Sequence, residues 1–288
     1  MLSIKNIIDL TVPQYLIITI FTPLSAWLLL GITSSFPELL FSIISLSMAM
    51  LAFNIINMIF DAKIDKISKP SRPIPSGNVS MKEAATLASI FCIGSILLAF
   101  YVNTYTLSLI LIFFLISFLY TNPITYLRKY FWAPSVIGAV IYGIVPFFMA
   151  ASISSKSINP IYPLFFASLI FFIGPSKDIE DMRGDKKGKI ISLPILVGVK
   201  KTVIFIIGGI ITLLVCMALL SLINLISFKF VFPSLASIYL FLWINKKYIR
   251  HINNPEIHEI IVTQSKFVTT NMVAIITIQI LYGITSIL

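Results

Sequence analysis

Nine long, mostly apolar runs follow one another along this chain of 288 residues. A helix of roughly 20 such residues crosses the bilayer core of about 30 Å. The fourth and sixth runs are short for a full crossing, which favours helices that end against a protein-lined cavity. The sequence therefore predicts an all-α membrane bundle of nine transmembrane helices around a central cavity. The runs are 16–32, 39–60, 84–102, 107–119, 131–153, 161–175, 203–226, 228–243 and 267–288.

The composition excludes most other classes of protein. Only 11% of the residues are charged and the mean hydropathy is +1.00, whereas a soluble domain carries about a quarter charged residues. The two cysteines, Cys92 and Cys216, lie in apolar runs without a partner at ligand spacing. We therefore expect neither a structural disulfide nor a zinc site.

The placement of basic residues gives the expected orientation. With nine spans, all of the 21 Lys and Arg residues except Lys156 and Lys229 fall on the side that holds the amino terminus. Cytoplasmic loops are rich in Lys and Arg, so we expect a multi-pass cell-membrane protein with its amino terminus inside and its carboxyl terminus outside. This bias accounts for the net charge of +10 without a nucleic-acid partner, and leaves some attraction for anionic membrane lipid.

Acidic residues concentrate in two stripes on the cytoplasmic side. Asn57, Asp61 and Asp65 repeat every four residues after the second run, and Asn54 lies one turn earlier. After the sixth run, acidic residues recur at i, i+3 and i+7. Each spacing keeps the side chains on one face of a helix. The second stripe consists of Asp178, Asp181 and Asp185.

The two stripes occupy corresponding places in the chain. Each lies at the cytoplasmic end of an even-numbered span, and the two are four spans apart. A parallel duplication would look like this. We therefore expect a single domain over residues 1–288, with a possible pseudo-repeat of 1–130 and 131–288.

Facing carboxylates at a membrane surface repel one another unless a cation lies between them. Mg²⁺ prefers oxygen ligands and uses one or two carboxylates together with substrate phosphates. The loops that follow both stripes are basic. The pattern therefore favours a magnesium-dependent clamp for a diphosphate, and the competing interpretation is solvated charge on cytoplasmic loops.

Both stripes resemble motifs of a known family. The segment 57–77, NMIFDAKIDKISKPSRPIPSG, resembles the NDxxDxxxD loop and RPxPSG tail of the UbiA superfamily of intramembrane prenyltransferases. The segment 177–194, KDIEDMRGDKKGKIISLP, resembles the second loop of that family. The nine-span count and the side of the membrane agree with the family, so the resemblance covers essentially the whole chain.

The resemblance implies a reaction and a set of site residues. An isoprenyl diphosphate is ionised with Mg²⁺, and an acceptor captures the allylic cation. The implied catalytic residues are Asp61, Asp65, Asp181 and Asp185. The implied metal ligands are these four together with Asn57 and Asp178. The implied substrate-binding residues are Asn54, Asn57, Lys69, Arg72, Tyr120, Arg128, Lys129, Lys177 and Lys187.

The chain departs from the family pattern at three places, the first of them near its start, where Val12 and Pro13 replace a common Arg-Pro pair. Met58 stands where many members have a second Asp. In the loop after the fourth run, the usual Tyr with Lys four residues later is replaced by Tyr120, Tyr126, Arg128 and Lys129 in another spacing. We expect Lys129 or Arg128 to contact the diphosphate there.

The amino-acid sequence of the two loops is most similar to that of the archaeal ether-lipid branch of the family, the digeranylgeranylglyceryl phosphate synthases. This implies transfer from geranylgeranyl diphosphate to the glycerol hydroxyl of geranylgeranylglyceryl phosphate. The alternative acceptor is aromatic, as in quinone, tocopherol or haem pathways.

Two other classes compete with a prenyltransferase. An ion-coupled transporter would more often place its carboxylates near the midplane on broken helices. A CDP-alcohol phosphatidyltransferase would show a compact Asp-Gly and Ala-Arg pattern in one helix, which is absent here.

Overall fold

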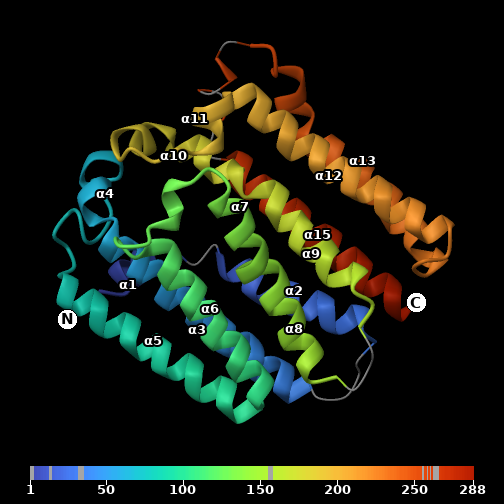
Figure 1. The fold of residues 1–288 in the computed structure, drawn as a ribbon, viewed down its shortest axis with the longest axis horizontal. Coiled ribbons are helices and arrows are strands. Elements are labelled where there is room, and N and C mark those ends of the chain that lie inside the picture. Colours follow the sequence, from blue (N-terminus) through green and yellow to red (C-terminus); the bar gives the residue numbers. More distant parts are fainter. Residues whose placement is uncertain are drawn as a thin grey trace.

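A computed structural model gives the fold, and it describes residues 3–12, 15–31, 36–154, 158–254, 256–257, 259, 261 and 266–288. Over these residues the chain is helical and contains no strand. The helices run side by side as a bundle, and α4, α10 and α11 lie together at one end of it (Figure 1). The elements are α1 (Ile4–Thr11), α2 (Leu16–Leu29), α3 (Phe36–Phe60), α4 (Ala62–Ser68), α5 (Met81–Val102), α6 (Thr104–Thr121), η2 (Leu127–Lys129), α7 (Ala133–Gly138), η3 (Ala139–Ile144), α8 (Val145–Ser152), α9 (Ile161–Ile173), α10 (Pro175–Lys187), α11 (Leu193–Val197), α12 (Val199–Leu222), η4 (Phe228–Phe230), α13 (Val231–Arg250) and α15 (Lys266–Ile287).

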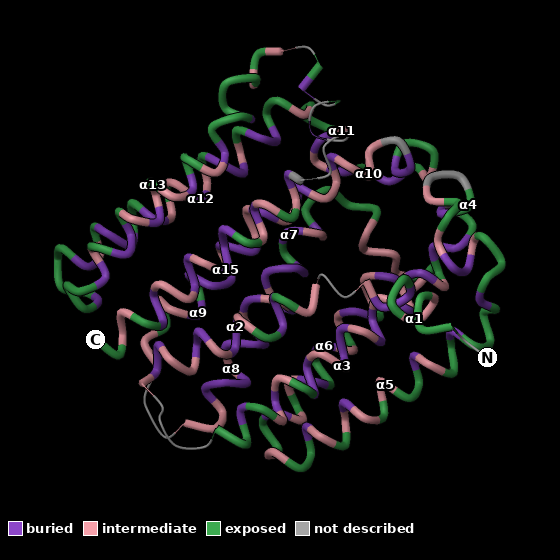
Figure 2. The backbone as a smooth tube through the Cα atoms, turned by 180° about the vertical axis from the view of Figure 1, so that it is seen from behind, coloured by how far each residue is buried: buried purple, intermediate pink, exposed green. Residues whose placement is uncertain are grey.

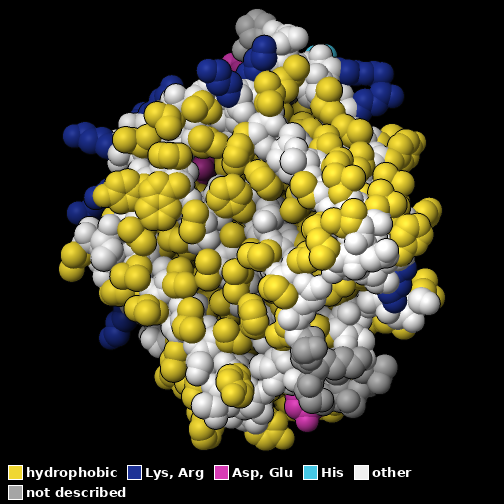
Figure 3. All heavy atoms as spheres, turned by 45° about the vertical axis from the view of Figure 1, so that its right-hand side comes forward, with side chains coloured by type: hydrophobic (Ala, Val, Ile, Leu, Met, Phe, Trp, Pro, Cys, Tyr) yellow, Lys and Arg dark blue, Asp and Glu magenta, His cyan; other side chains and the backbone are white. Residues whose placement is uncertain are grey.

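Each of the nine apolar runs lies on helix, but the expected count of nine spans is not confirmed. Within the described residues, seven helices are long and apolar enough to cross a membrane, or eight if the bent pair α1 and α2 forms one span. The remaining runs fall short because α2 has 14 residues and α9 has 13. A wide hydrophobic band covers the visible surface, with most of the visible Lys and Arg side chains at its rim (Figure 3).

Polar residues define where the helices begin. Ser80 and Glu83 form a capping box at the start of α5, in which each satisfies a backbone N–H of the other. Asn103 ends α5 and starts α6, since its side chain accepts a hydrogen bond from the Thr106 N–H at 2.7 Å. The tight connection makes α5 and α6 an antiparallel hairpin.

The buried side chains form two large clusters along the bundle. One joins α2, α9, α12, α13 and α15. The other joins α3, α5, α6 and the α7–η3–α8 span. Buried and exposed residues alternate along the helices (Figure 2), as expected for helices that pack on their neighbours with one side and meet lipid with the other.

A π-helical turn, η3, interrupts the span between α7 and α8. This turn packs closely on α9, because a Cβ atom built at Gly143 would lie 2.6 Å from Cα of Ala167. Only glycine allows the two backbones this approach. Such turns are rare and often mark functional sites.

Replacing Gly143 by Ala should lower the stability of the fold. The added methyl group meets backbone atoms of α9, which cannot move aside independently, so we expect a loss of about 1–3 kcal/mol. The thermal unfolding midpoint of the detergent-solubilised protein measures it. Gly208→Ala on α12 is the matched control, since nothing lies within 4 Å of its Cβ position. An equal midpoint for the two variants would contradict this account of the packing.

Candidate active site

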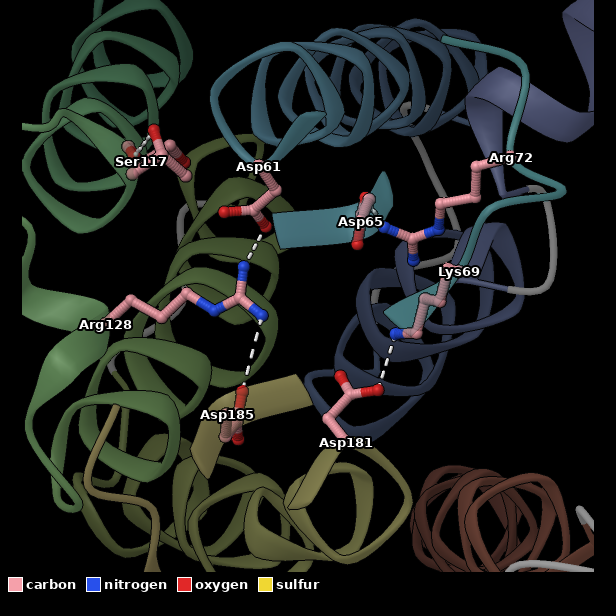
Figure 4. A network of polar contacts seen from close by, with 9 residues as sticks. Asp61, Asp65, Lys69, Arg72, Ser117, Arg128, Asp181 and Asp185 are labelled. Atoms are coloured by element: carbon pink, nitrogen blue, oxygen red, sulfur yellow. Dashed lines mark hydrogen bonds and ion pairs between the residues drawn. The ribbon is translucent and has the colours of Figure 1, made fainter. Parts of the chain in front are cut away.

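The two acidic stripes face each other at one end of the bundle. Asp61 and Asp65 come from the junction of α3 and α4, and Asp181 and Asp185 come from α10 (Figure 4). The backbone N–H of Asp61 donates to the Asn57 carbonyl at 2.9 Å, and that of Asp65 donates to the Asp61 carbonyl at 2.8 Å. Helical spacing therefore continues through the junction, and the first stripe keeps one face as the sequence predicts.

Three cations join the carboxylates. Arg128 bridges the stripes: one guanidinium nitrogen pairs with Asp61 and another lies 3.9 Å from Asp185. Lys69 donates to Asp181 at 2.5 Å, and so joins the loop after α4 to α10. Arg72 donates to Asp65 at 2.5 Å. The ion pairs of Lys69 and Arg128 join segments far apart in sequence and hold the stripes opposite each other.

Arg128 reaches this position because its loop is tightly turned. Tyr126 adopts a left-handed backbone conformation with φ of 39°, which is unfavourable for a residue with a bulky side chain. Its N–H donates to the Asn122 carbonyl at 2.7 Å, and the Lys129 carbonyl accepts from the N–H of Ile191. These bonds anchor the loop at both ends, one of them on the segment that follows α10.

Several oxygen atoms at the site are buried without a hydrogen-bond partner. They include Oδ1 of Asn57 and Oδ2 of Asp178. A buried acceptor without a partner is costly, whereas a hard divalent cation uses such oxygens as ligands. The donor set therefore fits Mg²⁺ in chemical type.

The carboxylates are not gathered around one point. No group of three or more His, Cys, Asp or Glu side chains within the described ranges is close enough to hold a metal ion. Lys and Arg side chains stand between them instead (Figure 4). Mg²⁺ often needs only one or two carboxylates when substrate phosphates and waters complete its shell, so this arrangement is compatible with binding beside a diphosphate.

The surroundings shift the pKa values of the acidic residues in opposite directions. Burial, reinforced by Asp185 and Asp181, raises the pKa of Asp178 to about 7. Burial also raises the pKa of Asp185 to about 6, against the opposing effect of Arg128. For Asp181, burial is outweighed by Lys69 and Lys177, and its pKa is lowered. The site therefore favours the ionised form of Asp181 and shifts Asp178 toward its protonated form.

Two connected cavities lie beside the stripes. The larger has an empty volume of about 1100 Å³, counted out to its open mouth, and reaches into the bundle between apolar side chains. The smaller has about 880 Å³ and is lined mainly by polar groups, Lys69 and Arg72 among them. The two share the wall formed by Tyr15, Asn54, Asn57, Lys177 and Asp181.

Most of the predicted site residues meet at these cavities. The larger cavity is lined by Asn54, Asn57, Tyr120, Arg128, Lys177, Asp178, Asp181 and Asp185. Asp61 and Asp65 are nearly buried, with 3% and 4% of their surface exposed, and lie behind Arg128 and Arg72. The amide nitrogen of Asn54 donates to the Thr11 carbonyl at 2.8 Å, which ties α3 to the end of α1.

Two expected binding residues lie elsewhere. Lys129 is exposed, and its ammonium lies 5.0 Å above the ring of Tyr130. Lys187, at the end of α10, is also exposed. Neither lines either of these two cavities, so the structure does not bring them to the other expected binding residues, and their role in binding stays a prediction. Of the two neighbours in the loop, only Arg128 points into the site, because the short η2 turn sends consecutive side chains in different directions.

Sequence reasoning missed several aromatic residues at the larger cavity. Tyr15, Phe53 and Tyr142 line it together with Tyr120. Lys177 lies 5.4 Å from the centre of the Tyr15 ring. Among the many aromatic residues of the chain, no spacing marks these, and only the packing of α2, α3 and η3 identifies them.

Comparison with known proteins places this fold and site in context. A match to the UbiA prenyltransferase family covers residues 16–261. Digeranylgeranylglyceryl phosphate synthase from Methanocaldococcus jannaschii is 38% identical over 53% of this chain and 52% of its own length. The enzyme of the same name from Methanoculleus marisnigri is 30% identical over 71% of this chain and 72% of its own. The matched part thus spans about half the length of the first of these relatives.

Solved structures share the architecture. A digeranylgeranylglyceryl phosphate synthase structure has a TM-score of 0.68 at 26% identity, covering 97% of this chain and 98% of that one. A UbiA homolog from Archaeoglobus fulgidus, bound to DMAPP and Mg²⁺, has a TM-score of 0.77 at 16% identity over 98% and 99% of the two chains. The second likeness shows the fold alone.

Proposed function

This chain belongs to the UbiA prenyltransferase family, and from that membership we propose that it transfers a prenyl group from a prenyl diphosphate to a lipophilic acceptor within the membrane. The observation that carries the proposal is the bridging of both acidic stripes by Arg128 at the mouth of an apolar cavity. A diphosphate needs the charged end, and its hydrocarbon tail needs the apolar interior.

Basic residues and oxygen-bearing residues of the site have different roles in this proposal. Arg128, Lys69 and Arg72 provide cationic donors for the phosphate oxygens. Asn57, Asp178 and the paired carboxylates would provide oxygen ligands for Mg²⁺, which is bound in the A. fulgidus homolog. When bound, Mg²⁺ neutralises charge that develops on the leaving diphosphate.

The apolar cavity protects the allylic cation, which is the other product of ionisation. Its aliphatic walls exclude water, which would otherwise capture the allylic cation. The rings of Tyr15, Phe53 and Tyr120 also line it, and aromatic rings stabilise positive charge. After the bond to the diphosphate has broken, the acceptor forms its bond to the allylic carbon and loses a proton, which the released diphosphate accepts.

We propose geranylgeranyl diphosphate as the donor and the glycerol hydroxyl of geranylgeranylglyceryl phosphate as the acceptor. The relatives from M. jannaschii and M. marisnigri carry the name of that reaction. The smaller cavity supports it, because its cations Lys69, Arg72 and Lys177 suit an acceptor that bears a phosphate. The alternative is an aromatic acceptor.

We also propose that the amino terminus and this end of the bundle face the cytoplasm. Lys156, one of the two basic residues expected outside, lies outside the described residues. Lys229, the other, is the middle residue of η4 and donates to the Ser286 carbonyl near the end of α15.

A direct acceptor assay tests the function. Purified protein in lipid nanodiscs is given radiolabelled geranylgeranyl diphosphate, Mg²⁺, and either geranylgeranylglyceryl phosphate or an aromatic acid. We expect labelled ether lipid with the first acceptor, and complete loss of product when EDTA removes the metal. Product only with the aromatic acid would favour the alternative acceptor, and product in EDTA would contradict the metal requirement.

A vesicle experiment separates the enzyme from a transporter. Uptake of an ion or solute without formation of any prenylated lipid would contradict the prenyltransferase proposal.

A further inference from the structure

The larger cavity ends inside the bundle on a small set of side chains. Along α3 it is lined by Asn57, Asn54, Phe53 and finally Met50. Met50 precedes Asp61 by eleven residues, which at 1.5 Å per residue places it about 16 Å from the acidic end. Along the α7–η3 span the last lining residue is Tyr142. These two residues therefore mark the floor of the cavity.

Tyr142 is held firmly at this floor. It lies in the π-helical turn η3, and its side chain packs against both large hydrophobic clusters. Gly143, the next residue, presses the same turn onto the backbone of α9. Because close-packed interiors yield little, the ring cannot easily move deeper to make room.

Gly138 lies beside the ring of Tyr142. A Cβ atom at Gly138 would lie 3.9 Å from Cδ2 of Tyr142 and 3.6 Å from Cγ2 of Ile170. The tyrosine ring thus folds back toward the preceding turn, as helical side chains do. Both Cβ distances are ordinary van der Waals contacts, so an alanine fits there, but its methyl group takes space from the cavity.

We propose that Tyr142, supported by the π-helical turn, sets the longest prenyl chain that the cavity accepts, and that Gly138 keeps the space before it open. This inference rests on the proposed function, since it concerns the tail of the diphosphate substrate. Its physical basis is that a longer tail must displace the clamped ring. Each methylene that gains or loses a place in a hydrophobic pocket changes selectivity by about 10–200-fold.

Two substitutions with opposite expected effects test the proposal. Tyr142→Ala lowers the floor, so the selectivity ratio of kcat/KM for a prenyl diphosphate of five isoprene units over one of four should rise by about tenfold or more. Gly138→Ala narrows the same space, so the ratio for four units over three should fall. Selectivity that shifts in opposite directions cannot come from a general loss of folding.

Control variants separate the ring from other effects. Tyr142→Phe keeps the ring and removes the hydroxyl, so its chain-length selectivity should equal that of the wild type. Tyr239→Ala removes a tyrosine that is 73% exposed on the outer face of α13, and it should leave both activity and selectivity unchanged. A shift of selectivity in Tyr142→Phe would assign the effect to the hydroxyl and overturn the proposal.

A binding measurement distinguishes failure of this inference from failure of the proposed function. Calorimetry with prenyl thiolodiphosphates of three to five isoprene units reports tail selectivity without any acceptor. Affinity ratios that change in opposite directions in Tyr142→Ala and Gly138→Ala support the floor even if no transfer is seen, in which case only the proposed reaction fails. Ratios equal to those of the wild type in both variants overturn the inference even if turnover is normal. Absence of all binding by the wild-type protein overturns both.

Discussion

Replacing Asp61 or Asp185 by Asn should reduce prenyl transfer by about 10³-fold or more, because each change removes a charged oxygen ligand where charge develops on the leaving group. The two residues lie on opposite stripes but share Arg128. We therefore expect the double variant to lose little more than either single one, as happens for groups that act as a unit. Initial rates with saturating donor and Mg²⁺ measure the effect.

The asparagine substitutions keep the shape of the side chain, so folding can be checked separately. The thermal midpoint of each variant in detergent shows whether the bundle survives. Asp9→Asn is the matched control, since Asp9 is exposed on α1 and lies outside both cavities. Full activity in Asp61→Asn, with normal folding, would remove the first stripe from the reaction.

Arg128→Gln should weaken diphosphate binding by about 10²-fold, whereas Lys129→Gln should leave it almost unchanged. Truncating one member of a buried, hydrogen-bonded charge pair costs about 2–5 kcal/mol. Arg128 lines the larger cavity and bridges two carboxylates, while its neighbour Lys129 is exposed. Titration with inorganic pyrophosphate and Mg²⁺ measures the affinity of each variant.

Comparing Arg128→Gln with Lys129→Gln tests the position of the cation and not the charge of the loop, because each variant loses one positive charge from the same loop. Arg128→Gln also leaves Asp61 and Asp185 facing each other without their shared cation, which lowers stability. Adding Asp61→Asn should restore part of the thermal midpoint but not the pyrophosphate affinity. Equal losses of affinity in Arg128→Gln and Lys129→Gln would mean that the loop contributes only its overall charge.

The two acidic stripes were predictable because their geometry is local. Spacings of three and four residues place side chains on one helical face, and the structure keeps both faces intact across the α3–α4 junction and along α10. The positions of the helical runs were likewise predictable, from hydropathy. The number of spans was not predictable in this way, because α2 and α9 are too short to qualify as spans by length.

The rest of the site depends on contacts that no local pattern encodes. The choice between Arg128 and Lys129 is made by a left-handed residue, Tyr126, and by the three-residue turn after it. Tyr142 lines the cavity through a π-helical turn and the close approach of Gly143 to α9. Both outcomes arise from packing between segments that are distant in the sequence.

The four ion pairs at the site have a consequence for how ligands enter. Lys69, Arg72 and Arg128 already pair with carboxylates before any substrate arrives, so every aspartate of the two stripes except Asp178 has a cationic partner in the empty protein. Binding of a metal and an anion then becomes an exchange of partners. The metal binds the carboxylate of an existing pair, and the anion binds the Lys or Arg that the carboxylate releases. Two ligands of opposite sign should consequently assist each other's entry, and either one alone must break a pair without compensation.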